Sequence, residues 1–278
     1  MHDFAASAPQ SGKIGLMLFT RYFTAYCVRP FRALGFIALI ISGLATLAFL
    51  FPWLNQRQRG SIAQHWSGMI LRTLGIRLRM TGTRPAGPAL LVANHLSWAD
   101  PFVLIACYPV HFVAKAEIRR WPVFGWLAAM AGTIFIQRDR QRDLSKVAQA
   151  FVSHLNDGSA VGMFPESTTS DGSRLLPFKP ALFQVAVSAA ADCHPVALGY
   201  DHCAAIWIDN MGFLSSVWHV MAQPCITASV HFCPAIAYQG QHRRDLAAAS
   251  EAAIANALCL PAPRIPLETP DDPPAAMH

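Results

Sequence analysis

The sequence predicts an α/β domain whose sheet has a parallel centre and flanking helices, preceded by an N-terminal hydrophobic helical membrane element. Three observations predict this organisation. From Gly75 to about Leu260, apolar runs of strand length alternate with segments of helix length. An uncharged run, Ala33 to Leu54, comes before them. Only 14% of the residues are charged, against roughly 25% in soluble domains, which favours a membrane-associated protein.

The uncharged run reads ALGFIALIISGLATLAFLFPWL. As a helix it would be about 33 Å long, enough to cross a hydrocarbon core of about 30 Å. It begins too late and is too long for a signal peptide. Basic residues flank it on both sides, so the positive-inside rule assigns no orientation. A spanning helix, a helix pair within one leaflet that bends at Pro52, and a buried core helix are all consistent with the pattern.

The body follows in order after Gly75. Ile76, Leu78 and Met80 alternate with arginines, which is typical of a half-exposed strand. The further strands are expected at 88–93, 111–114, 133–136, 160–164, 195–200 and 226–232. Helices are expected at 61–74, 99–107, 122–130, 142–156, 180–190 and 243–258. The chain therefore divides into N-terminal membrane-associated helices (1–74), an α/β domain (75–260) and a disordered proline-rich tail (261–278).

Three polar clusters directly follow or end predicted strands. Their sequences are NHLSWAD at 94–100, GTIFIQR at 132–138 and FPESTTSDG at 164–172. Ligand sites in open α/β sheets collect at the carboxyl ends of the strands. We therefore expect the three clusters to converge on one site.

The first cluster offers general-base chemistry. His95 lies at a strand end and Asp100 follows where a helix should begin, so a tight turn could bring the carboxylate to one imidazole nitrogen. Imidazole, with an ordinary pKa of about 6.5, suits a base at neutral pH. By itself the spacing is common, and Ser97 and Asp100 could equally be helix-capping residues.

The other two clusters are less specific. Arg138 could hold a phosphate by two parallel hydrogen bonds, although the charged stretch around it is also typical of a solvated loop. Glu166 and the small hydroxyl residues after it could contact a polar ligand, although an ordinary polar turn has the same composition.

Composition excludes several other classes. A formal net charge of +6 suits an anionic membrane surface or an acidic substrate. No basic run alternates with aromatic residues, which disfavours nucleic acid as a partner. The seven cysteines are scattered and form no C-x-x-C pair, so we expect reduced thiols that face a cytoplasmic environment, and no metal site. Together with the apolar N-terminal run, this predicts a location at the inner (cytoplasmic) membrane, with the active site on the cytoplasmic side. No cofactor is expected.

Together the clusters resemble the acyltransferase family that includes 1-acyl-glycerol-3-phosphate acyltransferase. That family carries N-H-x-x-x-x-D, then G-x-x-F-I-x-R, then F-P-E-G-T-R-S, then a short apolar segment with proline. Here these stand as NHLSWAD, GTIFIQR, FPESTTS and HPVAL (194–198), in order, over roughly residues 75–235. The resemblance implies a glycerol-phosphate-acyltransferase-like sheet. It also implies an O-acyltransferase of phospholipid biosynthesis, with acyl-CoA or acyl carrier protein as donor and a lysophospholipid as acceptor.

The resemblance also implies roles for individual residues. His95 is similar to the general base that deprotonates the acceptor hydroxyl, and Asp100 to its orienting partner. Arg138 is implied to bind the acceptor's phosphate and Glu166 its glycerol portion. The remaining residues expected in substrate binding are Asn94, Ser97, Ser167, Thr168 and Lys179.

Two positions depart from the family pattern. Ser167 replaces a glycine, so any positive φ there would be strained. Thr169 replaces an arginine, which removes one candidate phosphate ligand that Lys179 or Arg174 could replace. Lysophosphatidic acid, giving phosphatidic acid, is the expected acceptor. Lyso-ornithine lipid is the alternative, because relatives acting on it often contain T-T-x-D-G, as this chain does.

Two other classes compete with this function. A noncatalytic lipid-binding membrane protein is the second alternative, favoured by both departures but opposed by the retained His95, Asp100, Arg138 and Glu166. A hydrolase is disfavoured because the chain has no G-x-S-x-G motif.

Overall fold

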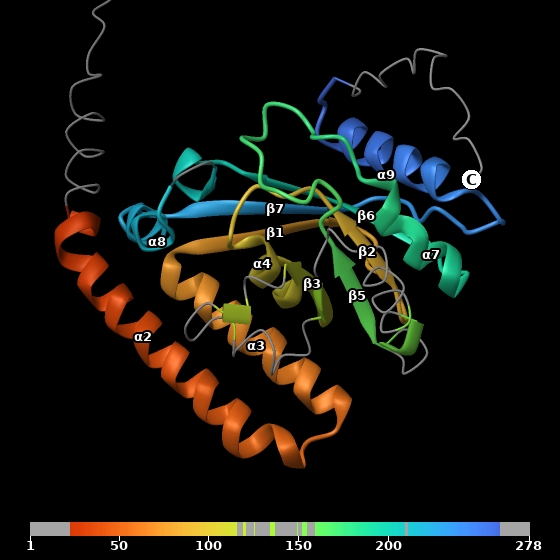
Figure 1. Ribbon diagram of the computed structural model, residues 1–278. Coiled ribbons are helices and arrows are strands. Elements are labelled where there is room, and N and C mark those ends of the chain that lie inside the picture. Colours follow the sequence, from red (N-terminus) through yellow and green to blue (C-terminus); the bar gives the residue numbers. More distant parts are fainter. Residues whose placement is uncertain are drawn as a thin grey trace, which may run out of the picture.

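The computed structural model describes residues 23–115, 119–120, 125, 134–136, 149, 152–154, 159–208 and 211–261. In them a seven-stranded sheet has the order β1-β7-β6-β2-β5-β3-β4 (Figure 1). The strands are β1 Ile76–Gly82, β2 Leu90–Ala93, β3 Val110–Lys115, β4 Ile134–Ile136, β5 Ala160–Met163, β6 Cys193–Tyr200 and β7 Ile226–Phe232. The α-helices are α2 Arg29–Ala45, α3 Gln56–Leu74, α4 Asp100–Cys107, α7 Gln184–Ala189, α8 Phe213–Met221 and α9 Arg243–Ala257.

The centre of the sheet is parallel, as the sequence predicts. The strands from β6 through β2, β5 and β3 to β4 all run in the same direction. At the other edge β7 is antiparallel to β6, and β1 pairs in parallel with β7. The carboxyl ends of the five parallel strands therefore meet at one edge of the sheet.

Each face of the sheet is covered by its own set of helices. In β2, Leu91 and Ala93 belong to the apolar core shared with α3, α4 and α8. The alternate residues, Leu90 and Val92, belong to a second core with α7 and α9. Successive strand side chains point to opposite faces, so this fully buried strand requires apolar residues at every position. Its sequence, LLVA, meets that requirement.

Helix α3 joins the N-terminal region to the body. It begins at Gln56, earlier than predicted, because the Asn55 side chain accepts from the Gln58 backbone and the Gln58 side chain accepts from the Asn55 backbone. It ends at the predicted Gly75, whose φ of 82° suits glycine. Ile70, Leu71 and Leu74 lie in the main core. The domain boundary at residue 74 stays a prediction, because the end of a helix does not test it.

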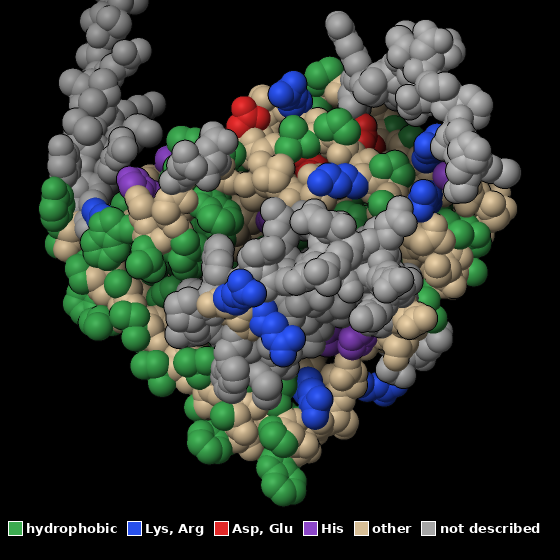
Figure 2. Space-filling view, in the orientation of Figure 1, with side chains coloured by type: hydrophobic (Ala, Val, Ile, Leu, Met, Phe, Trp, Pro, Cys, Tyr) green, Lys and Arg blue, Asp and Glu red, His purple; other side chains and the backbone are tan. Residues whose placement is uncertain are grey.

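The uncharged run forms a helix that extends from Tyr26 to Trp53 and includes α2. It is the one helix in the described part of the chain that is long and apolar enough to cross a membrane. Only 22% of its most apolar window is buried, which disfavours the core-helix interpretation. Figure 2 shows apolar side chains along the flank of the molecule where α2 lies in Figure 1.

Arg32 fixes the start of α2 against the body. Its guanidinium donates to the backbone oxygens of Met221, Gln223 and Pro224, at the end of α8. Further along α2, the Trp66 indole of α3 donates to the Leu39 carbonyl at 2.8 Å. The apolar helix is therefore held in a defined place beside α3 and α8.

The structure differs from the predicted elements at α8 and at residues 180–190. Helix α8 is present although the sequence patterns predict no element for its residues. The segment at 180–190 is a 3₁₀ turn, Pro180–Phe183, followed by the short α7. The helices expected at 122–130 and 142–156 lie mostly outside the described residues, as does the proline-rich tail after Pro261.

Candidate active site

The turn between β2 and α4 brings His95 and Asp100 together. Asp100 is the first residue of α4, and its Oδ2 accepts from the backbone N–H groups of Leu96 (2.7 Å) and Ser97 (2.8 Å). The same oxygen lies 2.8 Å from Nδ1 of His95. The carboxylate therefore closes the turn and contacts the imidazole with one atom, which fits the expected orienting role. It does not cap the helix, because its two backbone donors precede α4 and no side-chain cap bond forms at the N-cap residue, Ala99.

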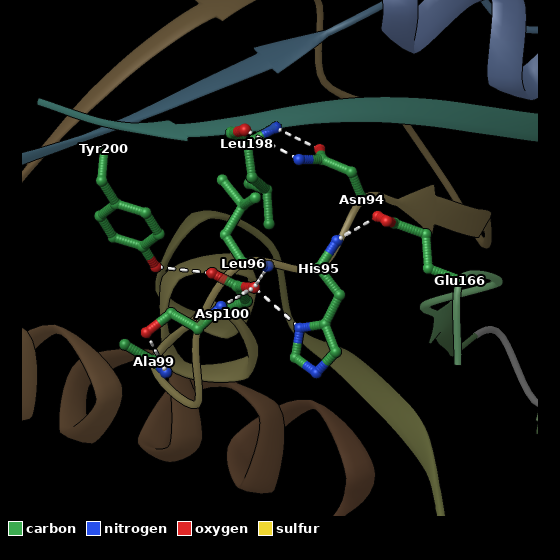
Figure 3. A network of polar contacts seen from close by, with 9 residues as sticks. Asn94, His95, Leu96, Ala99, Asp100, Glu166, Leu198 and Tyr200 are labelled. Carbon is green, nitrogen blue, oxygen red and sulfur yellow. Dashed lines mark hydrogen bonds and ion pairs between the residues drawn. The ribbon is translucent and has the colours of Figure 1, made fainter. Parts of the chain in front are cut away.

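Burial differs sharply between the two side chains. Asp100 is fully buried, whereas the His95 side chain is 19% exposed. In Figure 3 the ring nitrogen Nε2 points away from Asp100, and no described residue is shown to bond to it. A carboxylate at Nδ1 favours the tautomer with the proton on Nδ1, leaving Nε2 as a proton acceptor.

Asn94 and Tyr200 connect this turn to the neighbouring strand β6. The Asn94 amide donates to the Leu198 carbonyl at 3.0 Å and accepts from its N–H at 2.7 Å. The Tyr200 hydroxyl donates to Oδ1 of Asp100 at 2.6 Å (Figure 3). Burial, the charge on Asp100 and this hydrogen bond raise the pKa of Tyr200 well above its ordinary value.

Glu166, from the third cluster, is buried beside the first cluster. Its Oε1 accepts from the His95 N–H at 2.8 Å, and its Oε2 accepts from the Leu176 N–H at 3.0 Å. Burial raises the pKa of Glu166, while these two backbone donors oppose the shift. The carboxylate therefore holds the backbone of two loops together. Its predicted contact with the acceptor stays a prediction.

Phe164 supports the imidazole from the end of β5. Its ring stacks on that of His95, with centroids 4.2 Å apart and planes 16° apart. Phe164 also stacks with Phe112 of β3, with ring centroids 5.3 Å apart. The His95 carbonyl also accepts from the Ser170 N–H at 2.9 Å. Both the ring and the backbone of His95 are thus fixed by the third cluster.

Ser167 has a φ of 67°. This agrees with the expectation that the position suits glycine, because a positive φ costs a residue with a Cβ atom about 1 kcal/mol or more. Ser167 is buried, and its N–H donates to the Phe164 carbonyl at 3.0 Å. The strained residue therefore forms part of the tight turn that follows β5.

The structure brings together most, but not all, of the predicted site residues. Ser97 is buried, and its hydroxyl accepts from the Ala99 N–H. Thr168 and Lys179 are exposed, and the Lys179 N–H donates to the Pro165 carbonyl of the third cluster. Arg138 lies outside the described residues. Substrate binding by these residues stays a prediction.

Sequence reasoning missed Tyr200 and Phe164 as members of this site. Phe164 is the first residue of the FPESTTSDG cluster, and Tyr200 ends the strand that contains the HPVAL block. Membership of the one block and proximity to the other were the available signals. Among the described residues, no group of three His, Cys, Asp or Glu side chains could hold a metal ion.

Comparisons with known proteins agree on one family. The family model described as "Acyltransferase" matches residues 76–199. The 1-acyl-sn-glycerol-3-phosphate acyltransferase of Neisseria gonorrhoeae is 35% identical over 198 residues, covering 69% of this chain and 78% of the relative. The chain belongs to the 1-acyl-sn-glycerol-3-phosphate acyltransferase family. It is therefore an O-acyltransferase, and the alternative of a noncatalytic lipid-binding protein is set aside.

Other members of this acyltransferase family are similar over most of their length. The lyso-ornithine lipid O-acyltransferase of Pseudomonas aeruginosa is 32% identical over 246 residues, covering 83% of this chain and 92% of the relative. The crystal structure of the 1-acyl-sn-glycerophosphate (LPA) acyltransferase PlsC from Thermotoga maritima matches with a TM-score of 0.63 at 18% identity. It covers 88% of this chain and 95% of that one, and confirms the fold. The enzyme is thus a lysophospholipid or glycerolipid acyltransferase of the PlsC type.

Proposed function

We propose that this acyltransferase transfers a fatty acyl group from a thioester of coenzyme A or acyl carrier protein to the free hydroxyl of 1-acyl-sn-glycerol-3-phosphate, forming phosphatidic acid. The observation that carries the proposal is the 2.8 Å contact between His95 Nδ1 and the buried Asp100 carboxylate. It leaves the partly exposed imidazole as a base for an incoming hydroxyl.

The proposed reaction is a direct transfer without an acyl-enzyme. The acceptor's oxygen attacks the thioester carbonyl carbon, while Nε2 of His95 takes the hydroxyl proton. The new C–O bond forms, the C–S bond breaks, and the proton passes from His95 to the departing thiolate. The Asp100 carboxylate stabilises the imidazolium between these steps. General-base assistance of this kind typically contributes 10²–10⁴-fold in rate.

A second acceptor is favoured by a separate observation. The third cluster has Thr169 where the family pattern has arginine, and it continues as T-T-S-D-G. Four similar relatives, including the Pseudomonas aeruginosa protein, are lyso-ornithine lipid O-acyltransferases. Lyso-ornithine lipid carries no phosphate, so an enzyme acting on it has no need of the missing arginine. It is therefore the alternative acceptor.

We further propose that the reaction takes place on the cytoplasmic side of the inner membrane. Among the described residues, most of the large apolar side chains that are exposed lie on the Tyr26–Trp53 helix or on α8, which Arg32 holds together. The Arg29 guanidinium lies 4.5 Å from the ring centroid of Trp218, on the exposed side of α8. Such Arg and Trp side chains suit the boundary between lipid and water. This surface supports access of both lipid substrates from the bilayer.

A product screen by mass spectrometry tests the proposal. The purified full chain in mixed micelles is offered lysophosphatidic acid, other lysophospholipids or lyso-ornithine lipid. Each acceptor is tested with a fatty acyl thioester of coenzyme A and with one of acyl carrier protein. The expected product is phosphatidic acid, and its rate of formation should fall at least 10²-fold in the His95→Ala variant. Transfer to lyso-ornithine lipid alone would replace the first acceptor by the second.

His65→Ala is the matched control for the loss of an imidazole. His65 is exposed on α3, and its Nδ1 contacts only the Ser61 carbonyl of its own helix among the hydrogen bonds described. The His65→Ala enzyme should transfer acyl groups at the wild-type rate. Near-normal transfer by a folded His95→Ala protein would end the general-base mechanism.

A further inference from the structure

The two oxygens of the Asp100 carboxylate have different surroundings. Oδ2 is shared by the His95 imidazole and the two backbone N–H groups of the turn. Oδ1 faces β6 and accepts from the Tyr200 hydroxyl at 2.6 Å. A carboxylate held through one oxygen can still rotate about its Cβ–Cγ bond, whereas a donor on each oxygen fixes its plane. The hydroxyl of Tyr200 supplies that second donor.

Tyr200 is well placed to do this because its own position is set by the sheet. It is the last residue of β6 and pairs with Ala228 of β7. Two residues earlier, Leu198 exchanges two hydrogen bonds with the Asn94 side chain, directly before His95. The backbone of β6 is thus tied to both the sheet and the active-site turn. The hydroxyl also stays a neutral donor over the working pH range, because burial and the Asp100 charge raise the pKa of Tyr200 well above its ordinary value.

We propose that Tyr200 is a positioning residue for acyl transfer, whose hydroxyl holds Oδ1 of Asp100 so that Oδ2 stays aligned with Nδ1 of His95. The inference rests on the proposed role of His95 as general base. Tyr200 does not touch the reacting atoms in this arrangement. It acts through Asp100, by fixing the orientation of the carboxylate and by withdrawing some of its negative charge.

The two effects predict a distinctive kinetic result for Tyr200→Phe. Loss of the alignment should lower kcat by about 10-fold, as expected for one hydrogen bond to a charged group. The KM for the lysolipid should stay within twofold, because the ring and the substrate surface are kept. With one donor fewer, the carboxylate binds the imidazolium more strongly. The acidic limb of the kcat/KM profile should therefore move to higher pH, which a purely structural defect would not cause.

Tyr108→Phe is a matched control. The Tyr108 hydroxyl also donates a hydrogen bond to a single oxygen, the Gly87 carbonyl, outside the described active site. The control should keep the wild-type kcat and pH profile. If Tyr200→Phe does not fold, 3-fluorotyrosine and 3,5-difluorotyrosine at position 200 keep the ring and hydroxyl while strengthening the donor. They should then move the acidic limb to lower pH.

The outcomes distinguish this inference from the proposed function. His95→Ala is assayed alongside. An inactive His95→Ala protein together with a wild-type pH profile for Tyr200→Phe, or for the fluorotyrosine proteins, would overturn the positioning role alone. Near-normal activity of His95→Ala would overturn the general base and the positioning role together. A shifted profile for Tyr200→Phe, with an unchanged Tyr108→Phe, would support the inference.

Discussion

Replacing Asp100 by asparagine separates the charge of this side chain from its shape. In the structure Oδ2 accepts from the Leu96 and Ser97 N–H groups and contacts the His95 ring. An asparagine can place its carbonyl oxygen there and turn its amide toward the Tyr200 hydroxyl, which can also accept. The turn between β2 and α4 then stays closed, and only the negative charge beside the imidazole is lost.

The expected loss of activity follows from the distance between the two groups. His95 Nδ1 and Asp100 Oδ2 are 2.8 Å apart, but both charges are spread over their groups, so their centres are about 4 Å apart. At an effective dielectric constant of about 20, unit charges at about 4 Å interact by about 4 kcal/mol. Because about 1.4 kcal/mol changes a rate tenfold, we expect Asp100→Asn to lower kcat by about 10³-fold.

The assay is acyl transfer to the preferred lysolipid, measured by mass spectrometry over a range of acceptor concentrations, with thermal unfolding as the test of folding. Asp201→Asn is the matched control: Asp201 directly follows β6, is exposed, and accepts from the Thr227 N–H at 2.7 Å. It should keep the wild-type kcat. A folded Asp100→Asn enzyme with more than a tenth of the wild-type kcat would refute the electrostatic reasoning.

Three further predictions concern stability. Ser167→Gly should raise the unfolding midpoint by about 2 °C, because it relieves a positive φ worth about 1 kcal/mol; Ser167→Ala, which keeps a Cβ atom, should give no increase. Burial raises the pKa of Glu166 above its ordinary value of 4.5, so the stability of the wild type relative to Glu166→Gln should be greatest below that pH. It should then decline as the pH rises through the folded-state pKa, with a slope of at most about 1.4 kcal/mol for each pH unit; a pH-independent difference in denaturant unfolding would contradict this. Arg32→Ala removes the hydrogen bonds from α2 to the end of α8 and should lower the unfolding free energy in denaturant by about 2–3 kcal/mol, while flotation with anionic vesicles stays unchanged.

Sequence patterns located most strands because their signals are local. An uninterrupted apolar run such as LLVA indicates a strand buried on both faces, and Gly75 marks a helix end by its backbone freedom. Helix α8 was missed although its residues follow a helical period: Val217 and Val220 are buried, while Ser215, Trp218 and His219 are exposed. The helix has only nine residues, and a helical period is recognised over a window of about 11–18 residues.

The reversal of β7 was also beyond local patterns. A half-buried strand has the same alternation whichever way it runs, and direction is decided by the chain's path around the neighbouring strands. The parallel centre was predictable because helix-length connections between strands favour parallel pairing. The antiparallel pair of β6 and β7 departs from this rule, although α8 lies between the two strands in the chain.

Local sequence likewise predicts some contacts of the active site and not others. His95 and Asp100 are five residues apart, so a single turn joins them and their contact could be inferred from the order of residues. Glu166, Leu198 and Tyr200 reach the same turn from other strands, and no feature of their local sequence specifies that contact. It depends on β2 lying between β5 and β6 in the sheet, because side chains and backbone groups from separate strands can bond only after the register between those strands is set.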